Sequence, residues 1–216
     1  QTPGACCIDG VCTPDLTPFQ CMMQAGVYIG PLACDSVQCP GDVTPCQSST
    51  GADPVAPEED WIAGTSDSGA GLLRAQSVGV SSMQTITVHG LSLSFNGGWQ
   101  PCSNPEMTFD VRAWAAGADG MPGNLVYEAL DQPATMSLTG TIYPTLVGNF
   151  PLVTWTIDVD CPVPAAWLSV QSNSVADDDC LFLWMSSTPE GMGLSLVDEG
   201  AGWTQETFGL NYCVEE

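Results

Sequence analysis

The sequence contains very little positive charge. Its 216 residues include 25 acidic residues but only two basic ones, Arg74 and Arg112, together with a single histidine, His89. Lysine is absent, and the formal net charge is −23. Nucleic acids are bound through Lys and Arg that neutralise phosphates, and anionic membranes attract the same residues. We therefore expect neither partner.

Long apolar runs are missing as well. No run approaches the length of a membrane span, so we expect no transmembrane segment. Charged residues make up 12% of the chain and hydrophobic residues 44%, the opposite of a disordered acidic chain, so the protein should fold. With 23 glycines and 17 prolines, turns should punctuate short strands rather than long helices.

The eleven cysteines indicate the compartment. Reactive thiolates need positive surroundings, which this chain lacks, so the cysteines are interpreted as disulfides formed in an oxidising environment. Gln1 is a residue that often cyclises after a leader is removed. We therefore expect a mature secreted protein, extracellular or on the cell surface.

Three regions differ in composition. Residues 1–46 hold seven cysteines and are too few to bury a core, which predicts a disulfide-rich module. Residues 47–60 are rich in Pro, Ser, Thr and acid and predict a linker. Residues 61–216 form the larger domain. A zinc site in the module is disfavoured because it lacks histidine.

Ten cysteines are expected in disulfides, and their connectivity stays open because six cysteines alone allow 15 pairings. They are Cys6, Cys7, Cys12, Cys21, Cys34, Cys39, Cys102, Cys161, Cys180 and Cys213. Eleven is odd, which leaves Cys46 as an unpaired or intermolecular cysteine. The alternative is that Cys46 bonds within the chain and another cysteine is buried and reduced.

Beyond residue 61, short runs alternate between apolar and polar residues with period two and end at Gly, Pro, Asn or Asp. This pattern predicts an all-β fold: an antiparallel two-sheet, jelly-roll-like sandwich, preceded by the small disulfide-rich module. The side chains expected inside the sandwich are Phe109, Val111, Trp155, Ile157, Val159, Leu181 and Leu183.

Several short motifs resemble a known group of secreted proteins. They are Ala-Cys-Cys-Ile-Asp-Gly-Val-Cys at 5–12, with Cys21, 26–30, Cys34 and Cys39-Pro40; the segment 108–123; Ala-Trp-Leu-Ser-Val at 166–170; Cys-Leu-Phe-Leu-Trp at 180–184; Gly202-Trp203; and Asn-Tyr-Cys at 211–213. The chain resembles secreted planctomycete-type bacterial proteins in which a cysteine-rich repeat precedes a β-sandwich. The resemblance implies an extracellular module without a known activity. Such modules usually sit in longer chains, and the end at Glu216 predicts a free-standing protein.

Catalytic constellations are scarce. His89 is the only imidazole, and no Gly-x-Ser-x-Gly elbow is present. Glycoside hydrolysis needs two carboxylates, and Asp158 and Asp160 share one face of a predicted strand, roughly 6.6 Å apart. That face should be solvated, so nothing would raise the pKa of one acid above that of the other. We therefore expect a protein that is not an enzyme.

Two kinds of binding site are conceivable. Calcium would suit the consecutive carboxylates of Asp177, Asp178 and Asp179, with Asp119 as a second candidate, although all of these also suit solvated turns. Polysaccharide would suit exposed indole rings, for which the candidates are Trp99, Trp114 and Trp203; the alternative is that they cover the ends of the sandwich.

The function expected from these observations is structural. A crosslinked, lysine-free β domain joined to a small module suits a subunit that binds its own copies head to tail in an extracellular filament, tube or surface layer. The alternative is an extracellular carbohydrate-binding module. No cofactor other than calcium is expected.

Overall fold

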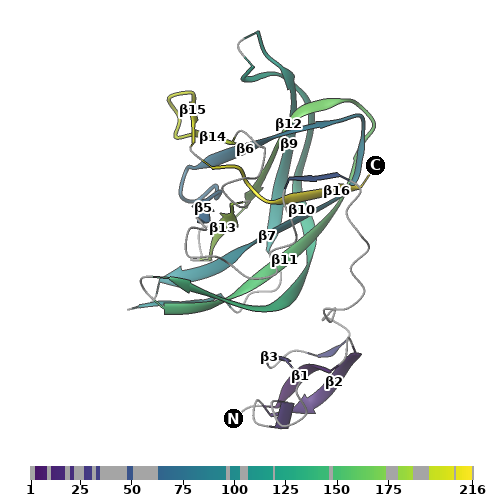
Figure 1. Ribbon diagram of the computed structural model, residues 1–216, viewed down its shortest axis with the longest axis vertical. Coiled ribbons are helices and arrows are strands. Elements are labelled where there is room, and N and C mark those ends of the chain that lie inside the picture. Colours follow the sequence, from purple (N-terminus) through teal and green to yellow (C-terminus); the bar gives the residue numbers. More distant parts are fainter. Residues whose placement is uncertain are drawn as a thin grey trace.

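The computed structural model describes most of the chain beyond residue 62 and parts of the N-terminal region. The described residues are 3–8, 11–17, 20–21, 27–30, 33–34, 48–50, 63–95, 98–102, 107–118, 120–145, 148–173, 180–186, 195–206 and 208–215. The protein is all-β in this part of the chain: one small sheet has three strands and one large sheet has thirteen (Figure 1).

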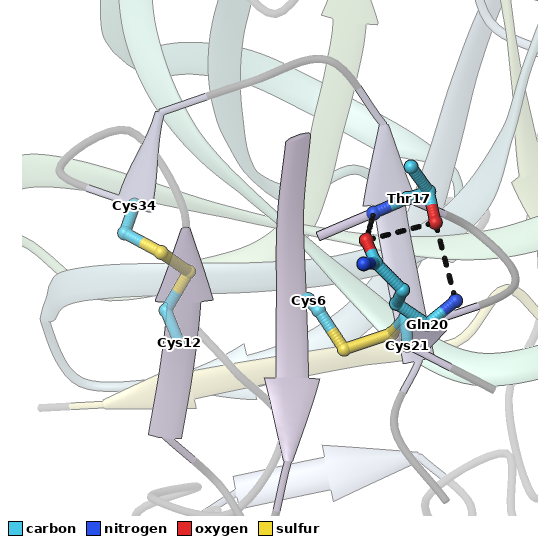
Figure 2. Close-up of a disulfide and its surroundings, with 6 residues drawn as sticks. All are labelled: Cys6, Cys12, Thr17, Gln20, Cys21 and Cys34. Carbon is cyan, nitrogen blue, oxygen red and sulfur yellow. Dashed lines mark hydrogen bonds between the residues drawn. A yellow bond between two sulfur atoms is a disulfide. The ribbon is translucent and has the colours of Figure 1, made fainter. Parts of the chain in front are cut away.

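The small sheet contains β1 (Gly4–Ile8), β2 (Val11–Leu16) and β3 (Val27–Gly30), in the antiparallel order β2–β1–β3. Among its described side chains, two disulfides crosslink it, Cys6–Cys21 and Cys12–Cys34, with Cα–Cα distances of 5.7 and 5.6 Å (Figure 2). Crosslinks of this span contribute about 3 kcal/mol each, which replaces the core that so short a segment cannot build.

A reciprocal pair of hydrogen bonds orients the segment that carries Cys21. The Thr17 backbone N–H donates to Gln20 Oε1 at 2.9 Å, and the Gln20 backbone N–H donates to Thr17 Oγ1 at 3.3 Å (Figure 2). This is the capping-box arrangement that a Thr-x-x-Gln sequence favours. It directs Cys21 towards Cys6.

The large sheet is antiparallel, and its main path runs β15–β14–β6–β12–β9–β10–β11–β7–β13–β5, with β16, β4 and β8 branching from it. Its strands are β4 (Ser48–Thr50), β5 (Ala63–Thr65), β6 (Leu73–Val80), β7 (Met83–Phe95), β8 (Trp99–Pro101), β9 (Thr108–Ala116), β10 (Pro122–Thr145), β11 (Gly148–Cys161), β12 (Ala165–Ser172), β13 (Leu181–Met185), β14 (Ser195–Asp198), β15 (Trp203–Gln205) and β16 (Tyr212–Glu215).

The 24-residue strand β10 connects the two halves of this sheet. Its first half, from Pro122 to Pro133, pairs with β9, and its second half, from Ala134 to Thr145, pairs with β11. A register shift precedes the change of partner, and Asp131 there has a φ of 54°. A residue in the left-handed region within a strand is typical of a bulge, which bends the strand.

The core lies between the two halves. Phe109 of β9 contacts Trp155 of β11 and Phe182 of β13 edge to face, with ring centroids 5.9 and 5.2 Å apart. At Gly90 a Cβ would lie 2.4 Å from the Leu183 carbonyl oxygen, so no side chain fits where β7 passes this cluster. The aromatic contacts show that the two halves face each other.

Four of the expected inner residues are fully buried, namely Phe109, Val111, Trp155 and Ile157. Val159 is partly buried against the same core.

The prediction for β13 placed the wrong side of the strand in the core. Phe182 and Trp184 are completely buried in the core, whereas Leu181 and Leu183 point to the other side and are half-buried. The run Leu-Phe-Leu-Trp-Met is apolar throughout, so it carries no alternation. The larger rings occupy the space between the two halves of the sheet.

Part of the predicted linker belongs to the large sheet. Residues Ser48–Thr50 form β4, which pairs with β16 in the register Tyr212–Thr50 to Val214–Ser48. The remainder of the predicted linker, residues 51–60 and residue 47, lies outside the described residues.

Candidate interaction surface

The outer side of β7, β10 and β11 carries mostly hydroxyl groups. Ile86 and Val88 of β7 are completely buried in the core, so Thr85, Thr87 and His89 point to the opposite side. Together with the outward residues of β10 and β11 they form what we term the threonine face. Its members are Thr85, Thr87, His89, Thr135, Ser137, Thr154 and Thr156.

Cross-strand pairing aligns these residues in rows. One row is Thr135–Thr156–Thr87, in which the hydroxyl oxygens of Thr87 and Thr156 lie 3.4 Å apart. The next row is Ser137–Thr154–His89. Directly opposite residues of antiparallel strands project to the same side, so the rows form a continuous surface.

His89 at the end of its row is a structural residue. It is 8% exposed, and its Nδ1 lies 2.9 Å from Asn211 Oδ1, a hydrogen bond between β7 and the residue preceding β16. The imidazole thus links β7 to the segment that leads into β16.

The threonine face has no charged side chain along most of its length. The segment from Gln132 to Ile157 contains no Asp, Glu, Lys or Arg, although the protein has a net charge of −23. Acid returns at one end, where Asp158 and Glu215 both pair with Thr85. This uncharged segment is visible in the sequence and is the signal from which such a face could be predicted.

An apolar cluster closes the other end of this side of the sheet. Leu91, Leu93, Phe150, Leu152 and Met185 are each at most 4% exposed and pack together with Tyr143. Burial raises the pKa of the Tyr143 phenol. Since the cluster is buried, the accessible part of the surface is the hydroxyl-bearing rows.

Strand β10 is the most exposed apolar element in the described part of the chain. Six large hydrophobic residues are exposed in the described part of the chain. Four of them lie on β10: Leu125, Val126, Leu130 and Ile142. Among the described strands, each half of β10 also has only one pairing neighbour. The backbone groups on the opposite edge of each half therefore have no strand to pair with in the described structure.

The outer side of the other half of the sheet carries charge. Arg112 of β9 donates to Glu128 at 2.8 Å, to Asp110 at 3.0 Å and to Gln171 at 3.0 Å. These partners come from β10, β9 and β12. The guanidinium thus uses its donors within the protein, where it neutralises neighbouring carboxylates.

A tryptophan cluster lies beside Arg112. Trp114 and Trp203 meet edge to face with centroids 5.5 Å apart, and Trp167 pairs directly opposite Trp114. Trp114, one of the candidates for an exposed ring, is only 8% exposed because the segment of β15 packs over it. Trp203 is half-buried, and Trp99 is 38% exposed on β8, in the opposite half of the sheet.

The second arginine is also engaged. Arg74 of β6 pairs with Glu206, and its Nε donates to the Thr65 carbonyl at 2.8 Å. Burial lowers the pKa of Arg74, and the nearby Glu199 partly opposes this. With both arginines paired internally, the described surface presents little positive charge.

The cysteines of the large sheet correct one prediction. Cys102 and Cys180 form a disulfide, and Cys213 is disulfide-bonded as well, with a partner outside the described side chains. Cys161, expected in a disulfide, is instead a buried free thiol. Its Sγ lies 3.6 Å from the Val163 carbonyl oxygen, and burial raises the pKa of the thiol.

The remaining predicted residues are placed as follows. Asp158 and Asp160 are exposed, as expected for a solvated face. The side chains of Cys7, Cys39 and Cys46 and the carboxylates of Asp119, Asp177, Asp178 and Asp179 lie outside the described residues. Among the residues that are described, no cluster of three or more His, Cys, Asp or Glu suits a metal ion, and no helix could cross a membrane.

The disulfides Cys6–Cys21, Cys12–Cys34 and Cys102–Cys180 indicate that the protein matures in an oxidising environment. Comparison of the chain with protein families, curated proteins and solved structures found no match.

Proposed function

We propose that this is a secreted, non-enzymatic structural protein whose copies assemble outside the cell or on its surface. The observation that supports this most directly is β10, which carries four of the six exposed large hydrophobic residues of the described chain and pairs with one neighbour along each half. Exposed apolar strands with unpaired edges are sites where another chain can add.

The two-part organisation supports growth beyond a dimer. The N-terminal module exposes Val11 of β2, 67% accessible, and can bind the large sheet of a neighbouring copy. Such a head-to-tail contact uses two different surfaces and produces a filament, tube or layer unless the rotation closes a ring.

The shape of the large sheet suits such a subunit. We propose that its two facing halves make a two-layer, jelly-roll-like sandwich, which the Phe109–Trp155 and Phe109–Phe182 contacts between the halves support. The absence of an enzymatic activity is proposed from the sequence, which has one histidine and no nucleophile elbow.

Polysaccharide binding is the second candidate. The contact of Trp114 with Trp203 beside the charged group around Arg112 favours it, since sugar sites combine aromatic rings with hydrogen-bonding side chains. Soluble polysaccharide should then quench tryptophan fluorescence, and Trp203→Ala should remove the quench. Calcium at Asp177–Asp179 or Asp119 stays a prediction.

The test of assembly is sedimentation velocity together with electron microscopy of the mature protein. Both are carried out at low, physiological and high salt, with and without calcium. We expect species larger than 22.6 kDa that increase with concentration. A monomer in every condition would refute the proposal and favour the sugar-binding alternative.

A further inference from the structure

We infer that the threonine face is the surface on which a second copy of this chain docks. The inference rests on the proposed function, since it names the contact through which copies associate. Two observations support it. The face carries hydroxyl groups and is partly accessible, and the segment from Gln132 to Ile157 has no charged residue.

Charge decides between candidate occupants. A neutral polysaccharide would meet no repulsion on any face of this protein, so it has no need of an uncharged one. A second copy carries the same net charge of −23, and like charges placed against each other cost several kcal/mol. A contact through side chains without carboxylates avoids this cost, and the seven members of the threonine face carry none.

Distance along the strand shows where the contact is centred. Thr154 lies four residues from Asp158 on β11, which corresponds to about 14 Å along an extended strand. The Debye length at physiological ionic strength is about 8 Å, but it is about 30 Å at 0.01 M salt. Repulsion from Asp158 is thus screened at the row Ser137–Thr154–His89 in physiological salt and is not screened at low salt.

The size of the face sets the strength of the contact. Three strands spaced about 4.8 Å apart, with three rows of side chains about 7 Å apart, cover roughly 300 Å². A stable interface buries about 800 Å² on each partner. The threonine face by itself therefore supports a weak contact.

The proposed pair of copies is symmetric because both copies use the same surface. A face that binds its own equivalent is related to it by a two-fold axis and forms a closed pair. The N-terminal module remains available in that pair for the second, propagating contact.

The test adds charge at the centre of the face. Thr154→Asp and Ser137→Asp are compared with Thr204→Asp, which adds the same charge on an exposed threonine of β15 in the other half of the sheet. We expect the two face variants to associate at least about tenfold more weakly than the wild type in sedimentation at 0.15 M salt, and Thr204→Asp to match the wild type. Circular dichroism melting curves confirm that each variant is folded.

Two further arms separate repulsion from loss of folding. An equimolar mixture of Thr154→Asp and Thr154→Lys should regain association that neither has alone, because opposite charges then meet across the two-fold axis. Asp158→Asn should strengthen association of the otherwise unchanged protein at 0.01 M salt by several-fold, with little effect at 0.15 M.

The outcomes distinguish this inference from the function on which it rests. If the wild type assembles but Thr154→Asp and Ser137→Asp assemble equally well, the contact lies elsewhere and only the inference is overturned. If the wild type stays monomeric throughout, the proposed function fails. Association that weakens steadily from 0.01 to 1 M salt would also overturn the inference, since it would indicate an ion-paired contact.

Discussion

The two outer sides of the large sheet differ in the side chains that they present. Both cover one core from opposite halves and face solvent. One side carries threonine and serine and, along most of its length, no charge, whereas the other gathers Arg112, Asp110 and Glu128 beside a cluster of tryptophans. Arg74 and Arg112 both form ion pairs in the half of the sheet that contains β6 and β9, so no arginine is left for the threonine face. The uncharged side is the one on which we propose that copies meet.

The largest expected effect is on the tryptophan side. Trp114→Ala should destabilise the protein by about 3 kcal/mol or more, because it removes a large buried ring that packs against Trp203. Urea denaturation measures the change. Trp99→Ala, at a ring that is 38% exposed, serves as the control, with an expected loss of about 1 kcal/mol or less. Equal losses would contradict the burial of Trp114.

A smaller loss is expected when the charged network is broken. Arg112→Ala leaves the carboxylate of Asp110, whose side chain is 12% exposed, without its cation. Because the group is only partly buried, we expect about 2 kcal/mol rather than the larger loss of a fully buried pair. Chemical denaturation of Arg112→Ala and of the double variant Asp110→Asn with Arg112→Ala checks this. The double variant should lose less than the single one.

Alkaline pH should act on the side that carries the threonine face. Burial raises the pKa of Tyr143 above its ordinary value of 10.0, so the folded phenol stays protonated where the unfolded one ionises. The stability due to this group is present below pH 10.0 and falls as the pH rises above it. Tyr143→Phe should flatten the fall in melting temperature above that pH. An unchanged slope would show that the phenol does not contribute.

The burial of the Cys161 thiol can be tested by alkylation. Cys161 is a free thiol, and burial raises its pKa, so we expect it to resist alkylation in the native protein and to react after denaturation without reduction. Mass spectrometry of the iodoacetamide-treated protein measures this. Rapid native labelling at Cys161 would contradict its burial.

The smallest effect is expected for a neutral change on the threonine face. Thr154→Ala should alter the free energy of unfolding by less than about 0.5 kcal/mol, since the side chain is half-buried and points away from the core. A loss comparable to that of Arg112→Ala would show that the two sides are not energetically different. Guanidinium denaturation, run beside the Arg112→Ala sample, makes the comparison direct.

Much of the architecture could be predicted from residue patterns. Alternation identified the buried side of β9 and β11, because Phe109 with Val111 and Trp155 with Ile157 are separated by polar residues. The cysteine count and the lack of basic residues identified disulfides, since no other chemistry suits such thiols. These properties depend on local period and composition, which the chain carries in itself.

Tertiary structure decided the rest. Nothing local tells whether Phe182 or Leu183 points inwards in an unbroken apolar run; the space between the facing halves selects the rings. Trp114 lies on the outer side of its strand, as alternation requires, but Trp203, 89 positions later, covers it. Likewise Cys161 is free because no other cysteine is its partner in space, not because of its sequence neighbours. Alternation assigns a side chain to a side of its sheet, whereas its burial and its partner depend on segments that only folding brings close.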